Sequence, residues 1–187
     1  MQFARYRIAF LALCAVSALR ARELSAQAQV ISLAALAPST LTVTVTSGAS
    51  QTIASVTDNV VNNFPSPVVI RTDWNVNPGQ TNTVNLVAYF TTPAQALVGG
   101  ATQIPSSRVE GRMLTGTPVA FTAITQNGTG GVGTAGGSLQ LFTVVIGGGN
   151  KIASRTDNLD LRLNLVGFPT LAAGSYTGVL NLQAVTQ

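Results

Sequence analysis

Few residues of this chain could perform chemistry. The 187-residue sequence contains no His, and its single cysteine, Cys14, cannot form an intramolecular disulfide. The commonest general base and metal ligand is therefore missing. Charged residues make up 9% of the chain, whereas soluble proteins average roughly 25%. These absences exclude most hydrolase triads and zinc sites, and we expect a protein that is not an enzyme.

Acidic pairs remain as candidates for acid–base catalysis, because a glycosidase needs two carboxyl groups that flank one sugar. Asp157 and Asp160 are close in sequence, but their odd spacing places them on opposite faces of a regular strand. We therefore predict solvated surface positions for the acids beyond residue 28, and no cofactor or metal. Calcium at a loop bearing Asp157 and Asn158 stays open, because carboxylates and carbonyls are its usual ligands. These acids are Asp58, Asp73, Glu110, Asp157 and Asp160.

Three glycines match a nucleotide-binding pattern. Gly128, Gly130 and Gly133 have the GxGxxG spacing. That motif binds phosphate only where a helix follows it, because the helix amino terminus carries the partial positive charge. Here two more glycines follow, and then a predicted strand from Leu139. The segment is therefore predicted to be a hairpin loop.

The amino terminus has the features of an export signal. Two arginines precede the apolar run 8–19, and Ala26-Gln27-Ala28 offers a small-x-small cleavage site. The run has 12 residues, whereas a membrane span needs about 20. We predict a Sec-type signal peptide over residues 1–28, no integral membrane span after cleavage, and a secreted or cell-surface protein. A retained anchor and a lipoprotein signal at Cys14 are the weaker alternatives.

The basic character of the chain belongs to this signal. Residues 1–28 contain four Arg and one Glu, so six basic and five acidic residues remain beyond them. A net charge of +1 gives no reason to expect nucleic acid as a partner. The remaining chain also lacks cysteine, so its core alone must hold the fold together.

Beyond the signal, aliphatic residues alternate with polar ones at a period of two. Leu41, Val43 and Val45 alternate with threonines, which places aliphatic side chains on one face of a strand. The run 139–146 is apolar on both faces and is predicted to be a central strand with both faces covered. Trp74 falls in an inward row and is predicted to fill the core. The predicted strands lie at 41–46, 68–76, 84–90, 119–123, 139–146, 159–165 and 176–184.

About seven to nine strands separated by polar turns predict an all-β fold, an antiparallel immunoglobulin-like β-sandwich. A closed barrel is the alternative. We expect a single domain over 40–187, preceded by an amino-terminal extension over 29–39.

The extension contains an apolar segment that ends at Pro38. It is either the first strand of its own sandwich or a donor strand that completes a neighbouring subunit by adding to an open sheet edge. The two readings stay open at the level of sequence. The residues that would be donated are Val30, Ile31, Leu33 and Leu36.

The carboxyl-terminal segment 173–187 resembles the last strand of secreted bacterial domains of the spore coat protein U and chaperone-usher pilin type. In those families a glycine 14 positions from the end opens an alternating strand that an assembly chaperone reads, and Gly174 occupies that position. The resemblance implies an exported subunit that polymerises by strand exchange, with a periplasmic assembly chaperone as a further partner. The terminal-strand residues concerned are Gly174, Tyr176, Leu180, Leu182 and Ala184.

These features together predict a noncatalytic structural subunit that self-associates into a homo-oligomer or pilus-like filament. The low charge fits this expectation, because copies repel one another weakly. The alternative is a secreted carbohydrate-binding or adhesive module, which would expose aromatic side chains such as Trp74, Tyr89 and Phe90 together.

Overall fold

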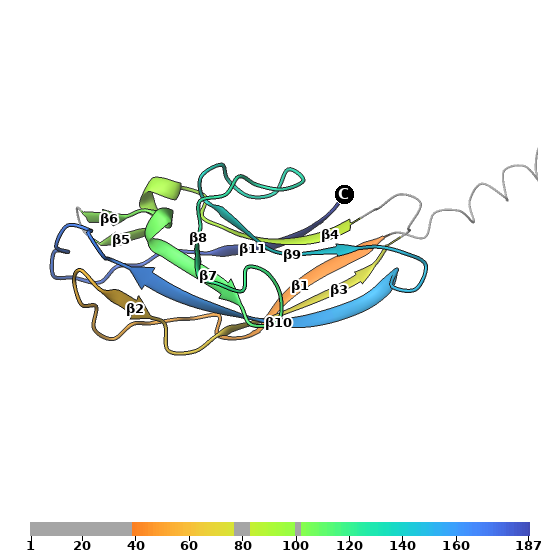
Figure 1. Ribbon diagram of the computed structural model, residues 1–187, viewed down its shortest axis with the longest axis horizontal. Coiled ribbons are helices and arrows are strands. Elements are labelled where there is room, and N and C mark those ends of the chain that lie inside the picture. The colour runs from red at the N-terminus through yellow and green to blue at the C-terminus, as the bar shows by residue number, and fades with distance from the viewer. Residues whose placement is uncertain (1–38, 77–82, 100–101) are drawn as a thin grey trace, which may run out of the picture. The chain divides into compact units, whose positions relative to one another are not determined.

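The computed structural model describes residues 39–76, 83–99 and 102–187. Ser39–Gln187 forms one compact unit, in which eleven strands, β1 to β11, and two short 3-10 turns are described (Figure 1). The predicted signal peptide and the four candidate donor residues lie outside the described residues. Within the described ranges, no helix is long and apolar enough to cross a membrane.

All strand pairs are antiparallel, and they form two main sheets and one small hairpin. The large sheet has the order β1-β3-β10-β7-β8, with β2 paired to the end of β10, and the small sheet has the order β11-β4-β9. The large sheet contains β1 (Thr40–Ser47), β2 (Val61–Asn63), β3 (Val68–Asn75), β7 (Val109–Met113), β8 (Thr122–Ala123) and β10 (Ile152–Asn164). The other strands are β4 (Thr83–Tyr89), β9 (Ser138–Val145) and β11 (Asn181–Thr186), with the hairpin of β5 (Leu97–Gly99) and β6 (Thr102–Ile104).

The two main sheets share one hydrophobic core. Most of its members come from β3, β7 and β10 of the large sheet and from β4 and β9 of the small sheet. The antiparallel all-β class is therefore confirmed. Both sheets end in edge strands, so the closed alternative is wrong.

The rows of buried side chains that the sequence predicts are confirmed in the central strands. In β3 every second side chain is buried, and Trp74 is only 5% exposed. The indole Nε1 of Trp74 donates to the backbone oxygen of Asn150 at 2.8 Å, which satisfies its single polar atom. In β10 the row from Leu159 to Leu165 is buried as predicted. Period-two alternation thus identifies the inner faces of these strands correctly.

The prediction that 139–146 is a central strand is wrong. Among the described strands, β9 pairs with β4 alone, and β4 is the middle strand of the small sheet. The apolar run has another cause: the register shifts, so that Leu86 faces Phe142 and Val87 faces Gln140. Leu141 is the extra residue of a β-bulge, which interrupts the alternation. Leu141 and Phe142 are consequently both buried although they are neighbours in sequence.

Two predicted strands are shorter than expected. Of 119–123, only Thr122–Ala123 forms a strand, and Val119 is 75% exposed. The predicted strand over 176–184 begins only at Asn181.

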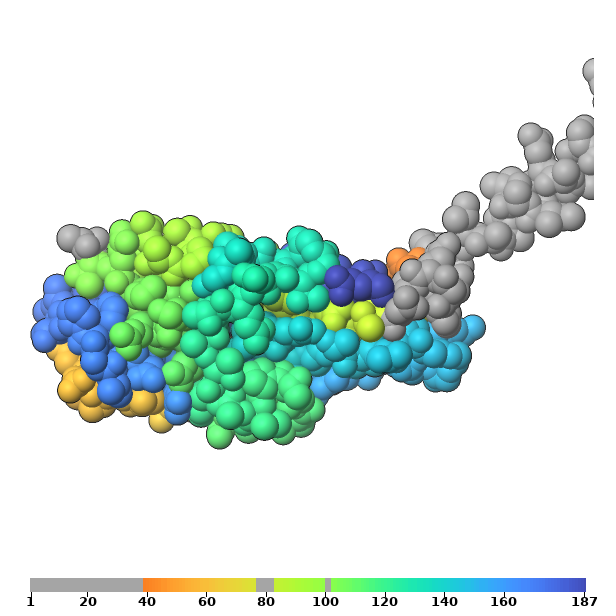
Figure 2. Space-filling view, turned by 45° about the horizontal axis from the view of Figure 1, so that its top comes forward, coloured from red at the N-terminus to blue at the C-terminus, as the bar shows by residue number. Residues whose placement is uncertain are grey.

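The glycine-rich loop between β8 and β9 folds back on the small sheet. Gln126 pairs with Ser138 at the start of β9, and the amide of Phe90 donates to the carbonyl of Gly137 at 2.9 Å. A strand rather than a helix follows the three glycines of the GxGxxG pattern. In Figure 2 the segment, coloured green to teal, lies on the visible surface of the molecule.

Candidate assembly site

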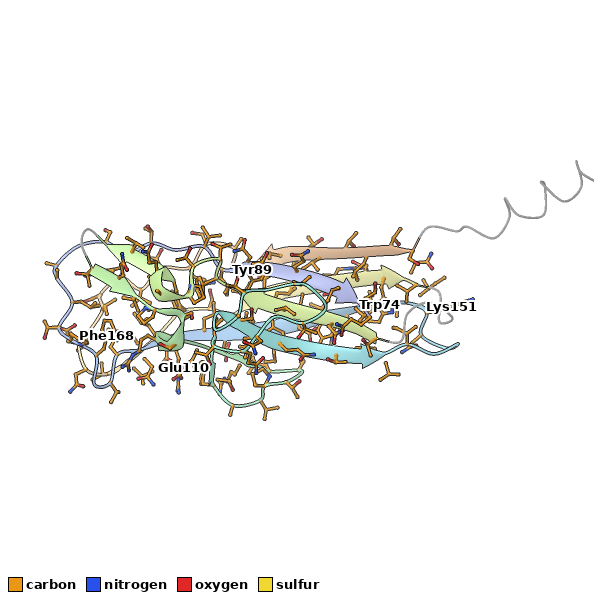
Figure 3. All side chains as sticks on the ribbon, turned by 90° about the horizontal axis from the view of Figure 1, so that it is seen from above. Trp74, Tyr89, Glu110, Lys151 and Phe168 are labelled. Carbon is orange, nitrogen blue, oxygen red and sulfur yellow. The ribbon has the colours of Figure 1, made fainter. Side chains whose placement is uncertain are left out.

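β1 and β11 are edge strands of different sheets that lie on the same flank of the core and contact each other. Figure 3 shows them side by side. Their inward side chains form a surface that we call the edge seam. Its members are Leu41, Val43 and Val45 of β1, with Leu180 beside β11 and Leu182 and Ala184 within it.

The edge seam is less completely buried than the rest of the core. Ile70 and Leu86, in the strands next to β1 and β11, are 0% exposed. All six seam residues pack against the core but are only half-buried. Apolar surface that stays in contact with water is surface that a further strand can still bury.

The two edge strands lack most of the usual protections against strand addition, although the pairing of β1 with β3 has a register shift between Val45 and Ser47. A free edge presents unpaired N–H and C=O groups, and natural proteins commonly blunt such edges with charged residues or proline. β1 has the sequence TLTVTVTS and β11 has the sequence NLQAVT. Neither contains a charged residue or a proline, so both edges remain able to pair.

The charges nearest to β1 cancel each other. Arg71 and Asp73 lie on the outer face of β3, and their side chains form an ion pair at 2.7 Å. Hydrogen bonds from the Arg71 guanidinium lower the pKa of Asp73, and the same bonds raise the pKa of Arg71. Both groups therefore stay charged and paired at neutral pH, and no net charge opposes a second chain at this edge.

The predicted terminal-strand residues divide into two groups. Leu180, Leu182 and Ala184 lie in the edge seam. Gly174 is exposed in the loop before β11. Tyr176 lies outside the seam: its hydroxyl donates to the backbone oxygen of Ala172 at 2.8 Å.

The predicted alternating strand does not begin at Gly174, because the chain first pairs with β5. Thr177 exchanges two backbone hydrogen bonds with Val98, at 2.8 and 3.0 Å. At Gly178 a Cβ atom would clash with the carbonyl oxygen of Ala96, so only glycine allows this close approach. The chain enters β11 only after this attachment.

Comparisons with protein-family models, curated proteins and solved structures find no match to this chain.

The predicted acids do not converge on a catalytic pocket. Asp157 was expected to be solvated, but it is 1% exposed and is held by Arg155 Nε at 2.6 Å and by the hydroxyl of Thr115 at 2.9 Å. It faces inward because it shares the inner row of β10 with Leu159. Asp160 points to the opposite face, as expected, and pairs with Arg112 at 2.9 Å.

A groove of about 370 Å³ is another candidate site. Its lining includes Phe64, Phe121, Arg112 and Arg162. Both guanidinium groups stack on the Phe121 ring, 4.6 and 4.1 Å from its centroid, and each pairs with a carboxylate. The two guanidinium groups of the groove are therefore already paired with carboxylates of the protein.

Sequence reasoning did not assign the β1 row to the site. Leu41, Val43 and Val45 show the same alternation as the rows of middle strands, so the pattern alone did not mark them as an edge. The absence of charge and proline in β1 does not mark it either, because the middle strand β4 (TVNLVAY) lacks both as well.

Proposed function

We propose that this chain is an exported, noncatalytic structural subunit with an immunoglobulin-like sandwich plan, which polymerises by strand donation. In this proposal residues 30–36 of one copy occupy the edge seam of another. The observation that carries it is the half-buried, uncharged seam between two neighbouring edge strands.

The candidate donor segment matches the edge seam in chemistry and length. Residues 29–38 contain no charged side chain and four large aliphatic ones. Seven extended residues span about 23 Å at roughly 3.3 Å per residue. The eight residues of β1 span about 26 Å on the same scale. The donor can therefore run along most of the seam.

Pro38 excludes the tightest hairpin turns between the segment and β1. To pair with β1 of its own copy, the segment would have to reverse direction between Leu36 and Thr40. The favoured two-residue hairpin turns need positive φ, which proline cannot adopt because its ring fixes φ near about −65°. A segment that continues away from its own β1 meets no such obstacle.

The charged groups support a noncatalytic role. Four of the five acids beyond residue 28 take part in ion pairs with arginines. The fifth, Asp58, accepts a backbone hydrogen bond from Leu171 at 3.2 Å. Carboxylates that are held in this way are poorly placed to act together on a substrate.

The carbohydrate-binding alternative has less support. Trp74 and Phe90 are 5% and 4% exposed, so they offer no platform on which a sugar could stack. The proposed partners are further copies of this chain and, by the resemblance described above, a periplasmic assembly chaperone. The proposed location is outside the cell or on its surface.

The proposal is tested in the full chain with Leu33→Asp, using Ser32→Asp as the matched control. Burying a carboxylate in an apolar seam is costly, so Leu33→Asp should leave folded monomers. The unaltered chain and Ser32→Asp should both assemble, as judged by sedimentation velocity and negative-stain microscopy. Assembly of Leu33→Asp to the normal extent would contradict donation. A chain that begins at Ser39 should be a folded monomer, and its unfolding would instead identify the segment as an internal strand.

A further inference from the structure

The glycine-rich loop between β8 and β9 contains a dipeptide that is able to react with itself. Asn127 precedes Gly128, and no other asparagine of the chain precedes a glycine. The backbone nitrogen of a residue can attack the side-chain amide carbon of an asparagine before it, which closes a five-membered ring. Glycine favours this attack, because it has no side chain beside the nitrogen and its backbone rotates freely.

The backbone of the loop is held on both sides of this dipeptide but not within it. Gln126 and Thr129 each exchange two backbone hydrogen bonds with other residues, at 2.7 to 3.1 Å. The N–H groups of Asn127 and Gly128 donate to no backbone carbonyl of the described residues. Asn127 is also exposed to water. The amide carbon of Asn127 and the nitrogen of Gly128 are therefore free to meet.

Packing requires glycine at position 128, so the reactive dipeptide is built into the loop. A Cβ atom at Gly128 would clash with the carbonyl oxygen of Val132. Asn63 shows the opposite arrangement. It is exposed as well, but the amide of Phe64 donates to the carbonyl of Leu161 at 3.2 Å, and the Phe64 side chain hinders ring closure. We therefore expect the two exposed asparagines to differ in reactivity.

We propose that Asn127 is a site of spontaneous deamidation, and that its conversion loosens the loop from β9. The nitrogen of Gly128 bonds to the side-chain amide carbon of Asn127 and gives up its proton, while the side-chain amide group takes a proton and leaves as ammonia. Water then adds to one of the two carbonyl carbons of the succinimide ring. Cleavage of one ring C–N bond gives aspartate, and cleavage of the other gives isoaspartate. The net change is one water consumed and one ammonia released, without an oxidant or a reductant.

Isoaspartate changes the loop at the place where it pairs with a sheet edge. It adds one carbon atom to the backbone between the anchors at Gln126 and Thr129. A carboxylate also enters the stretch 113–150, which otherwise has no charged residue. Both changes act on the bridge between Gln126 and Ser138 at the start of β9. Because β9 carries no charge or proline of its own, weaker pairing there uncovers an unprotected edge.

The site is tested by prolonged incubation of the full chain in neutral buffer, followed by peptide mapping with mass spectrometry. In the folded chain, aspartyl and isoaspartyl forms of the Asn127 peptide should accumulate about tenfold faster, or more, than those of the Asn63 peptide. Asn127→Gln should stay unconverted, because its longer side chain would have to close a larger ring. If the folded chain keeps Asn127 intact while the chain unfolded in urea is converted, the fold protects the site and the proposal is overturned.

The loosening of the loop is tested by amide hydrogen exchange on the converted chain. Exchange at Gln126 and Ser138 should be faster than in the fresh chain, whereas exchange at Trp74 should not change. Asn127→Asp is the matched control: it adds the same charge without the extra backbone atom, and should accelerate exchange less. Unchanged exchange at Gln126 and Ser138 in the converted chain would contradict the loosening. The reaction lies outside the edge seam and needs no assembled chains, so its outcome is separate from that of strand donation.

Discussion

The flank formed by β7, β8 and β9 is closed by side chains and loops, whereas the flank formed by β1 and β11 is open. On the closed flank Phe121 covers two ion pairs, and Arg155 stacks on Phe142 at 4.2 Å while it holds Asp157. Three of the four ion pairs in the described residues belong to this side. The open flank has the uncharged strands and the half-buried seam.

This difference shows where the few charged residues of the chain lie. Eleven charged residues lie beyond residue 28, and two of the ion pairs, Arg112–Asp160 and Arg162–Glu110, link the neighbouring strands β7 and β10. Arg155 in addition donates to the carbonyl of Thr115 in the loop after β7. β9 carries no charge or proline either, so what distinguishes this edge from β1 and β11 is the loop that pairs with it at Ser138.

One of the two largest effects is expected from Arg155→Ala on the closed flank. The substitution leaves the carboxylate of Asp157, which is 1% exposed, without its cation. Removing one partner of a buried ion pair typically costs about 3–5 kcal/mol. Urea unfolding of the full chain should show a loss of that size. A loss as small as that of an exposed pair would mean that Asp157 does not need Arg155, and the closed flank would then be held by its loops alone.

A matched pair of leucines measures how open the edge seam is. Leu86→Ala removes a side chain that is 0% exposed and should cost about 3–5 kcal/mol, because it leaves a cavity. Leu182→Ala removes a half-buried side chain of the neighbouring strand and should cost about 1–2 kcal/mol. Urea unfolding of unassembled chains gives both values. Equal losses would show that the seam is already closed within one copy.

The fold could be predicted from sequence wherever the alternation is regular. The rows of β3 and β10 bury every second residue, and two-residue spacing expresses this directly. β9 could not be predicted in this way, because the bulge at Leu141 buries two neighbouring residues. A bulge depends on the pairing of two strands, and one strand's composition does not reveal it.

The candidate site could be predicted only in part. Leu182 and Ala184 were found because the terminal segment alternates up to its end, but the same reading wrongly extended the strand back to Tyr176. The attachment of Thr177 to Val98 is a contact between distant parts of the chain, which local spacing does not encode. The β1 side of the seam needed the strand order, which decides whether an alternating strand is an edge or a middle strand.

The smallest effect is expected on the open flank, from Asp73→Asn. The Arg71–Asp73 pair is exposed, and exposed pairs contribute little because water and salt screen them. Hydrogen bonds from Arg71 lower the pKa of Asp73, so its contribution is present above the ordinary aspartate value of about 4 and is lost as pH falls through the lowered value. Thermal unfolding at neutral pH should change far less for Asp73→Asn than for Arg155→Ala, and the difference from the unaltered chain should vanish in acid. A large loss at neutral pH would show that charges also stabilise the open flank.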